Sequence, residues 1–310
     1  MNSQKADYIR TDLACERRRA DTEIPGVSYR EETLGMIQKS VLTVASEEGE
    51  REIQKPQGTY ITLSFKPLWQ QGEEELSQLS HALREVLLEI TPKKRDSSLL
   101  IAGLGNRSMT VDAIGPSVTA RIVATAHLKE LEPDIFHSLD CKSISSITPG
   151  VLAETGIESA ALIRGAVEAA KPDFVIAIDA LAAREVSRLA STIQVSNTGI
   201  LPGAGVGNPR AAVDEEALGI PVIVIGVPTV VDTSTLLYDA LERSGMKNIP
   251  PALSEVLENG RGYFVSPREC DIVTENVGRV IAEAIDGAFG LGRSVHDEST
   301  APFGGSEKSG

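Results

Sequence analysis

The apolar residues from Phe174 to Ile178 form an unbroken run that leads directly to an acid, Asp179. Continuous apolar character after the breaker Pro172-Asp173 predicts a strand that is buried on both faces of a sheet. An ionised carboxylate at the end of such a strand costs on the order of several kcal/mol if it leaves water without a partner. We therefore expect Asp179 to have a close partner or a shifted pKa.

A second apolar run, residues 99–103, also leads to an acid, because a polar turn after it carries the chain to Asp112. In a parallel sheet the carboxyl ends of neighbouring strands meet at one edge, and folds of this class place their sites there. The pattern therefore predicts that Asp112 and Asp179 lie together at that edge.

Helical periodicity alternates with further short apolar runs along most of the chain. It predicts helices at 73–90, 112–131, 155–170, 232–243 and 268–289, and strands at 41–44, 59–65, 192–195 and 222–225. This alternation predicts an α/β fold with a mostly parallel twisted sheet and helices on both of its faces. The strands at 41–44 and 59–65 are expected to form an antiparallel pair near the N-terminus.

Neither end of the chain shows this periodicity. Residues 1–35 are rich in charge and predict an exposed arm. Residues 291–310 are rich in glycine and serine and predict a flexible tail.

Composition excludes several classes of function. The chain has 310 residues with 30 Lys and Arg against 44 Asp and Glu, which gives a formal charge of −14. Such a charge disfavours direct contact with nucleic acid and suits basic protein partners. The N-terminus has no apolar signal core, and no run approaches the roughly 18 apolar residues of a membrane span, so we expect a cytoplasmic protein without membrane contact. The three cysteines show neither disulfide nor metal spacing.

Two glycine-rich segments follow predicted strands. Gly103-Leu104-Gly105-Asn106 has the start of a dinucleotide loop, but Ser108 stands where the third glycine is required, so a tight turn explains it better. The segment 199–208 has enough glycine to wrap an anion but lacks the Lys-Ser or Lys-Thr ending of a P-loop. We interpret it as a substrate-binding wall, with phosphate binding as the alternative.

The other side-chain chemistry is sparse. No histidines have HExxH spacing and no serine lies in a G-x-S-x-G motif, so neither a zinc site nor a serine nucleophile is predicted. The pair of acids remains. Two adjacent carboxylates share a proton, so one can act as a base toward water while the other donates to a substrate carbonyl. Taken singly, Asp112 is better explained as an acid that stabilises a helix N-terminus, and Asp179 as a loop cap.

An ordered set of motifs resembles the germination protease (spore protease) family. The motifs are Gly-Leu-Gly-Asn at 103–106, Asp-Ala-Ile-Gly-Pro at 112–116, Pro-Gly-Val at 149–151, Thr-Gly-Ile-Glu at 155–158, and the segments 172–184, 199–208 and 219–232. Together they cover nearly the whole chain apart from the tail.

This resemblance implies an endopeptidase of the forespore and spore core that degrades small acid-soluble, DNA-binding spore proteins at germination. It also implies a homotetrameric zymogen, with Asp112 and Asp179 at the positions of the catalytic aspartates. The motif residues expected to bind substrate or form the site wall are Asn106, Arg184, Gly203, Gly205 and Asn208.

The family is understood to cut after an acid in a Thr/Ser-Glu-Ile/Phe-Ala context. Thr11-Asp12-Leu13-Ala14 has the same order of chemistry, which predicts cleavage between Asp12 and Leu13. Residues 1–12 would then be a propeptide and residues 13–290 the catalytic domain. The segment 22–25, Thr-Glu-Ile-Pro, should resist, because proline lacks the amide donor that an extended bound peptide uses.

The fold of the family is similar to that of hydrogenase-maturation endopeptidases, which place a metal-binding Glu directly after the corresponding acid. This chain has Ala113 there, and no His or Cys at ligand spacing, so we predict catalysis without a metal or other cofactor. Peptidyl-tRNA hydrolases share Gly-Leu-Gly-Asn, but a charge of −14 clashes with their basic RNA-facing surface. Two alternatives stay open: a metal-dependent peptidase with the same aspartates as ligands, and a non-catalytic nucleotide-binding module.

Overall fold

A computed structural model describes residues 9–18, 23–93, 97–208, 210–245, 253, 255–257 and 262–291. The predicted tail, residues 291–310, lies outside these ranges except for its first residue. Residues 1–8 of the predicted propeptide lie outside them as well.

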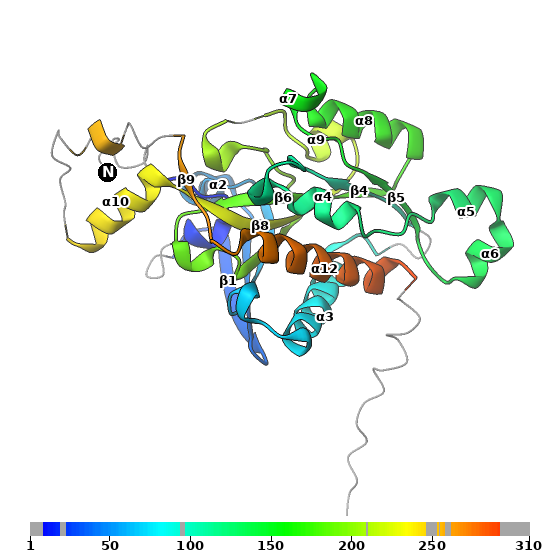
Figure 1. Ribbon diagram of the computed structural model, residues 1–310, viewed down its shortest axis with the longest axis horizontal. Coiled ribbons are helices and arrows are strands. Elements are labelled where there is room, and N and C mark those ends of the chain that lie inside the picture. Colours follow the sequence, from blue (N-terminus) through cyan, green and yellow to red (C-terminus); the bar gives the residue numbers. More distant parts are fainter. Residues whose placement is uncertain are drawn as a thin grey trace, which may run out of the picture.

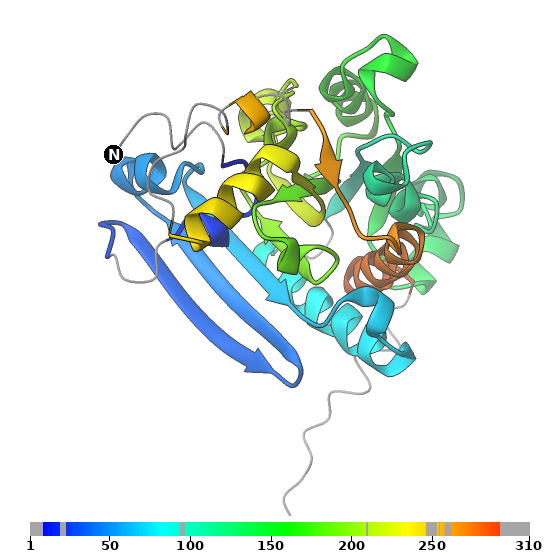
Figure 2. The ribbon, with the colours of Figure 1, turned by 60° about the vertical axis from the view of Figure 1, so that its left-hand side comes forward.

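The described strands form one mixed sheet (Figures 1 and 2). In chain order they are β1 (Val27–Leu34), β2 (Ile37–Val44), β3 (Gly58–Ser64), β4 (Ser98–Gly103), β5 (Ser143–Ile147), β6 (Phe174–Ala183), β7 (Thr192–Ser196), β8 (Val222–Asp232) and β9 (Phe264–Val265). Their order across the sheet is β1-β2-β3-β7-β8-β6-β4-β5, and β9 pairs with β8.

The parallel pairings lie on one side of the sheet, among β5, β4, β6 and β8. Every other strand pairing in the described part of the chain is antiparallel. The α/β class and the antiparallel pairing of β2 with β3 are therefore confirmed, but the expectation of a mostly parallel sheet is wrong. The N-terminal strands join the main sheet because Ile61 and Leu63 of β3 pack into the same core as Ile193 and Val195 of β7.

Helices cover both faces of the sheet, as predicted (Figure 1). They are α2 (Glu47–Ile53), α3 (Glu73–Ile90), α4 (Ile114–Thr119), α5 (Ala126–Leu131), α6 (Pro133–Ser138), α7 (Leu152–Thr155), α8 (Ser159–Ala170), α9 (Glu215–Leu218), α10 (Thr233–Arg243) and α12 (Cys270–Phe289). On one face, Leu83 of α3 and Ile281 of α12 belong to the same core as Ile176 of β6. On the other face, Ile163 of α8 packs with Val175. Among the described helices, none has the length and apolar content to cross a membrane.

The helix predicted at 112–131 is interrupted. It divides into a short 3-10 turn η3 (Thr110–Asp112), then α4 and α5. Between the last two, the Thr125 N–H donates to the Ile144 carbonyl at 2.9 Å and the Ile144 N–H donates to Thr125 Oγ1 at 3.0 Å. These bonds attach the chain to β5, a strand that the pattern did not predict, and they take the place of helical bonds.

Part of the predicted exposed arm belongs to the fold. The strand β1 pairs with β2 along its whole length, and Figure 2 shows both as a long ribbon at one edge of the sheet. Its middle and end are exposed, so it lacks the apolar alternation that reveals a half-buried strand. Leu13 and Ala14 are fully buried, which places the residues just after the predicted cleavage point inside the core.

Candidate active site

Asp179 lies on β6, just beyond the point where its neighbouring strand β4 ends. The strand β6 pairs with β4 only as far as Ile178, opposite Gly103, whereas its pairing with β8 continues to Ala183. The strand predicted to end at residue 178 therefore runs on through Asp179, because β8 supports it beyond the end of β4. Asp179 is buried, with 6% of its surface exposed, and it lines the cavity that opens past β4.

Asp112 reaches the same cavity from the turn after β4. The Asn106 N–H donates a 2.8 Å hydrogen bond to Asp112 Oδ2, and the Thr229 hydroxyl donates to the Val111 carbonyl at 2.7 Å. Gly105 has a φ of +107°, and a Cβ there would lie 2.0 Å from the carbonyl oxygen of Asp112. Only glycine fits this conformation and this close approach, so the turn itself positions the acid.

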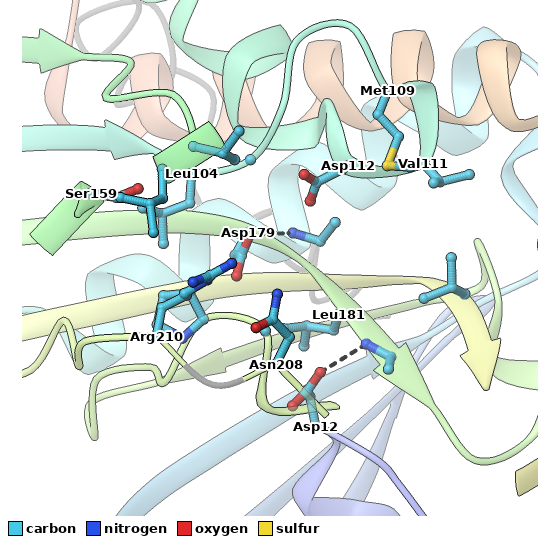
Figure 3. A pocket seen from close by; sticks show the side chains of 18 of the residues that line it. Asp12, Leu104, Met109, Val111, Asp112, Ser159, Asp179, Leu181, Asn208 and Arg210 are labelled. Atoms are coloured by element: carbon cyan, nitrogen blue, oxygen red, sulfur yellow. Dashed lines mark hydrogen bonds between the residues drawn. The ribbon is translucent and has the colours of Figure 1, made fainter. Parts of the chain in front are cut away.

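Asp112 and Asp179 line one cavity of about 320 Å³ (Figure 3). Much of its wall is apolar, including Leu104, Met109, Val111, Leu181 and Phe264. The structure thus brings together the two acids that the strand pattern places at one edge of the sheet.

Both acids hold their protons more tightly than an exposed aspartate does. Burial raises the pKa of Asp179 well above its ordinary value of 3.8, and the nearby charges of Asp112 and Asp12 raise it further. Burial also raises the pKa of Asp112, but the Asn106 N–H opposes this because it stabilises the ionised form. When the pair holds one proton, the environment therefore favours that proton on Asp179 rather than on Asp112.

A third acid, Asp12, borders the same cavity from the N-terminal segment (Figure 3). Its N–H donates to the Ala182 carbonyl at 2.9 Å, and the Ala182 N–H donates to Asp12 Oδ2 at 2.9 Å. Ala182 lies three residues beyond Asp179 on β6, or about 10 Å along an extended strand. The segment that contains the predicted cleavage point thus lies along the site, to one side of the two acids.

The residues after Asp12 are held firmly. Leu13 is fully buried in a cluster with Leu181 and Leu189. The buried Gln194 accepts the Ala14 N–H at 2.7 Å through Oε1 and donates to the Asp12 carbonyl at 3.3 Å through Nε2. The Asp12–Leu13 bond can therefore reach the two acids only after this segment moves.

The glycine-rich segment forms one wall of the cavity. Gly203 and Asn208 line it, and a Cβ on Gly203 would lie 2.2 Å from the Asn208 carbonyl oxygen. Gly205 packs against the third acid, since a Cβ there would lie 2.0 Å from Asp12 Oδ2. The segment therefore lies at the cavity, and its role in binding substrate stays a prediction.

The other two motif residues do not line this cavity. Asn106 acts through its main chain, by holding Asp112. Arg184 points to α10, where its guanidinium pairs with Asp239 at 2.7 Å and with Glu242 at 2.7 Å. Its main-chain N–H donates to Glu16, so it also helps to hold the N-terminal segment.

Three residues of the site have no motif that reveals them. Gln194 lies within the strand β7, Lys55 follows α2 and Arg210 follows the glycine-rich segment. Gln194 and Lys55 are placed by tertiary packing, since their neighbours Asp12 and Ala14 are far away in sequence. The one local signal is Thr11-Asp12-Leu13-Ala14, which marks the segment but not its neighbours.

The described residues include no group of three or more His, Cys, Asp or Glu side chains that could hold a metal ion. Asp112 and Asp179 alone would give a carboxylate pair, which suits hard cations better than zinc. Metal-free catalysis stays a prediction.

Paired carboxyl groups with raised pKa values can carry out general acid-base chemistry. The ionised member takes a proton from water, and the protonated member donates to a polarised carbonyl. The cavity also contains Glu158 beside the three aspartates, against the cation Arg210. Such an excess of acids favours a basic or neutral ligand over a phosphate.

Comparison with known proteins identifies the family of this chain. The germination protease family model matches residues 5–249. Germination protease from Caldanaerobacter subterraneus subsp. tengcongensis is 41% identical over 302 residues, covering 90% of this chain and 93% of that protein. The corresponding protein of Clostridium perfringens is 38% identical over 306 residues, covering 90% and 94%. That of Bacillus pumilus is 40% identical over 259 residues, covering 78% and 70%. This chain, with one acid in the turn that follows β4 and the other on β6, belongs to the germination protease family of peptidases.

Proposed function

We propose that this protein is the endopeptidase that begins the degradation of small acid-soluble, DNA-binding spore proteins in the germinating spore core. Membership of the germination protease family supports a peptidase with a role in germination. The observation that carries the catalytic part of the proposal is the shared cavity of Asp112 and Asp179, in which both acids have a raised pKa. The proposed assembly is a homotetramer.

In the proposed reaction Asp112 is the base and Asp179 the acid. Asp112 takes a proton from water, whose oxygen attacks the peptide carbonyl carbon, while Asp179 donates its proton to the carbonyl oxygen. The tetrahedral intermediate then collapses: its hydroxyl group returns a proton to Asp179, and Asp112 passes the other proton to the leaving amine as the C–N bond breaks. Both aspartates end in their starting states. The assignment follows from the Asn106 N–H, which stabilises charge on Asp112, and from the deeper burial of Asp179.

We further propose that the chain is a zymogen that processes itself between Asp12 and Leu13. Support comes from the position of Asp12, which borders the catalytic cavity, and from Leu13, which the core holds away from the acids. This arrangement is latent because the core holds Leu13 and Gln194 holds the Asp12 carbonyl, so both must be released before water at the acids can attack the bond.

Single and double substitutions test the catalytic pair. Asp112→Asn and Asp179→Asn keep the shape of each side chain but remove the shared proton, so each should lower activity by several orders of magnitude. The double variant should be little worse than either. The measurement is cleavage of a small acid-soluble spore protein and appearance of a new N-terminus at Leu13, with the exposed Asp134→Asn as a control of equal charge change. Substantial activity in a folded single variant would overturn the assignment.

A pH series tests the shared proton independently. Above both macroscopic pKa values the pair lacks an acid, and below both it lacks a base, so self-cleavage should follow a bell-shaped profile. Falling pH should therefore first accelerate processing and then slow it. A rate that does not change across the series would contradict a carboxyl pair.

A further inference from the structure

The Asp12 carboxylate occupies a position between two cavities, which we call the seat. One is the catalytic cavity, and the other, of about 450 Å³, is lined by Arg17, Gln54, Lys55 and Tyr60 as well as by Asp12. Asp12 is thus the side chain that lies between the catalytic acids and a region that carries positive charge.

Two main-chain groups form the walls of this seat. The Ala182 N–H donates to Asp12 Oδ2 at 2.9 Å. Gly205 approaches the same oxygen so closely that a Cβ would lie 2.0 Å from it, and its main chain also stabilises the ionised carboxylate. Both residues belong to the part of the chain that stays when residues 1–12 are removed.

The charges around the seat suit an anion. Burial raises the pKa of Asp12, and the ammonium group of Lys55 is the main influence that opposes it. Arg17 adds a second positive charge, and its buried Nε has no hydrogen-bond partner among the described residues. The acid Glu16 lies nearby, but its carboxylate already accepts the N–H groups of Arg184 and Glu185.

We propose that this seat is the subsite that recognises an acidic side chain of the substrate, with Lys55 as its specificity-determining residue. The proposal rests on the peptidase function proposed above. Once residues 1–12 leave, the partly buried Lys55 loses the carboxylate whose negative charge most stabilises its ammonium group, which is costly in a partly desolvated place. A substrate with an acidic side chain in the seat restores that charge interaction, whereas an amide of the same shape does not. The residue after its acid is not held as Leu13 and the Asp12 carbonyl are, so the next bond is free to reach the catalytic acids.

A matched pair of peptides tests the proposal. Residues 8–15, Tyr-Ile-Arg-Thr-Asp-Leu-Ala-Cys, contain a single acid, and the second peptide has Asn in its place. The full-length chain, after its own processing, should cleave the Asp peptide with a kcat/KM about 10- to 100-fold higher, the range for losing a hydrogen-bonded charge.

Variants at Lys55 assign that preference. Lys55→Gln should bring the Asp-to-Asn ratio close to one, through slower cleavage of the Asp peptide, and Lys55→Arg should retain the preference. The control is Arg51→Gln, which removes the same charge from an exposed site on α2 and should leave the ratio unchanged. The four-residue peptide Ile-Arg-Thr-Asp should also inhibit the unmodified enzyme more strongly than Ile-Arg-Thr-Asn, which tests the seat without any variant.

The outcomes separate the two proposals. If the unmodified protein cuts neither peptide nor a spore protein, the peptidase function itself fails. If it cuts both peptides equally and neither tetrapeptide inhibits better, the function stands and the seat is overturned. If it prefers the Asp peptide and Lys55→Gln keeps that preference, Lys55 is not the specificity-determining residue.

Discussion

The Ala182 N–H donates a 2.9 Å hydrogen bond to Asp12 Oδ2, while the Asp12 N–H donates to the Ala182 carbonyl at the same distance. This reciprocal pair fixes a residue of the N-terminal segment against the strand that carries Asp179. It joins the predicted cleavage site to the cavity of Asp112 and Asp179, because Asp12 and Ala182 both line that cavity.

Replacing Asp12 should change the titration of Asp179. The Asp12 carboxylate raises the pKa of Asp179, so Asp12→Asn should lower that pKa. Carbon-13 NMR of labelled aspartate carboxyl groups in the unprocessed protein would measure it, in the Asp112→Asn background to prevent cleavage. The exposed Asp134→Asn serves as the control and should leave the titration unchanged. A pKa that stays the same would show that the two carboxylates are not electrostatically coupled.

The Asp179 carboxyl group should lower the free energy of unfolding at neutral pH. Its pKa is raised in the folded state, so the folded protein binds the proton more tightly, and stability falls as pH rises from 3.8 through the folded pKa. Each tenfold increase in the proton affinity of the folded state lowers stability by about 1.4 kcal/mol above that window. Asp179→Asn should therefore raise the free energy of unfolding at pH 7, and the gain should vanish toward acid pH. Urea unfolding across a pH series would show this, and a less stable variant at pH 7 would contradict it.

Loosening the N-terminal segment should speed processing. Gln194→Met preserves length but removes the bonds to the Ala14 N–H and the Asp12 carbonyl. Leaving these groups unpaired costs about 1 to 3 kcal/mol, which favours a displaced segment whose Asp12–Leu13 bond can reach Asp112 and Asp179. The rate at which the Leu13 N-terminus appears is the measurement. Slower processing by a folded variant would instead indicate that Gln194 acts on the Asp12 carbonyl during the reaction.

A methyl group at Gly205 should expel the acid from its seat. The Cβ of Gly205→Ala would lie 2.0 Å from Asp12 Oδ2 and 2.8 Å from Ala182 Cβ, so one of these must move. Processed enzyme with this change should lose most of its preference for the Asp peptide over the Asn peptide. Gly165→Ala on α8 is the matched control, because no atom lies within 4 Å of its added Cβ. An unchanged preference in Gly205→Ala would place acid recognition elsewhere.

Local sequence determined those features whose interactions are close along the chain. The apolar run 174–178 predicts a strand that is buried on both faces, and the structure buries all five residues, because only such burial removes a continuous apolar run from water. The glycines at 103 and 105 determined the tight turn that brings α4 and Asp112 against β4, because a side chain at either position would collide with main-chain atoms. The two candidate acids followed from these elements and from the family motifs.

Tertiary structure alone decided how far each strand extends and which residues surround the acids. The strand β6 passes beyond Ile178 because β8 continues to pair with it. Asp179 becomes part of a cavity because β4 stops pairing with β6 at Ile178. The sheet is mixed because β7 pairs antiparallel with both β8 and β3, and the residues paired between β3 and β7 are more than a hundred positions apart. The seat of Asp12 likewise joins Ala182, Gly205 and Lys55 from distant segments. Sequence periodicity reports which side chains avoid water, but the partner that covers each one is chosen only when the chain packs.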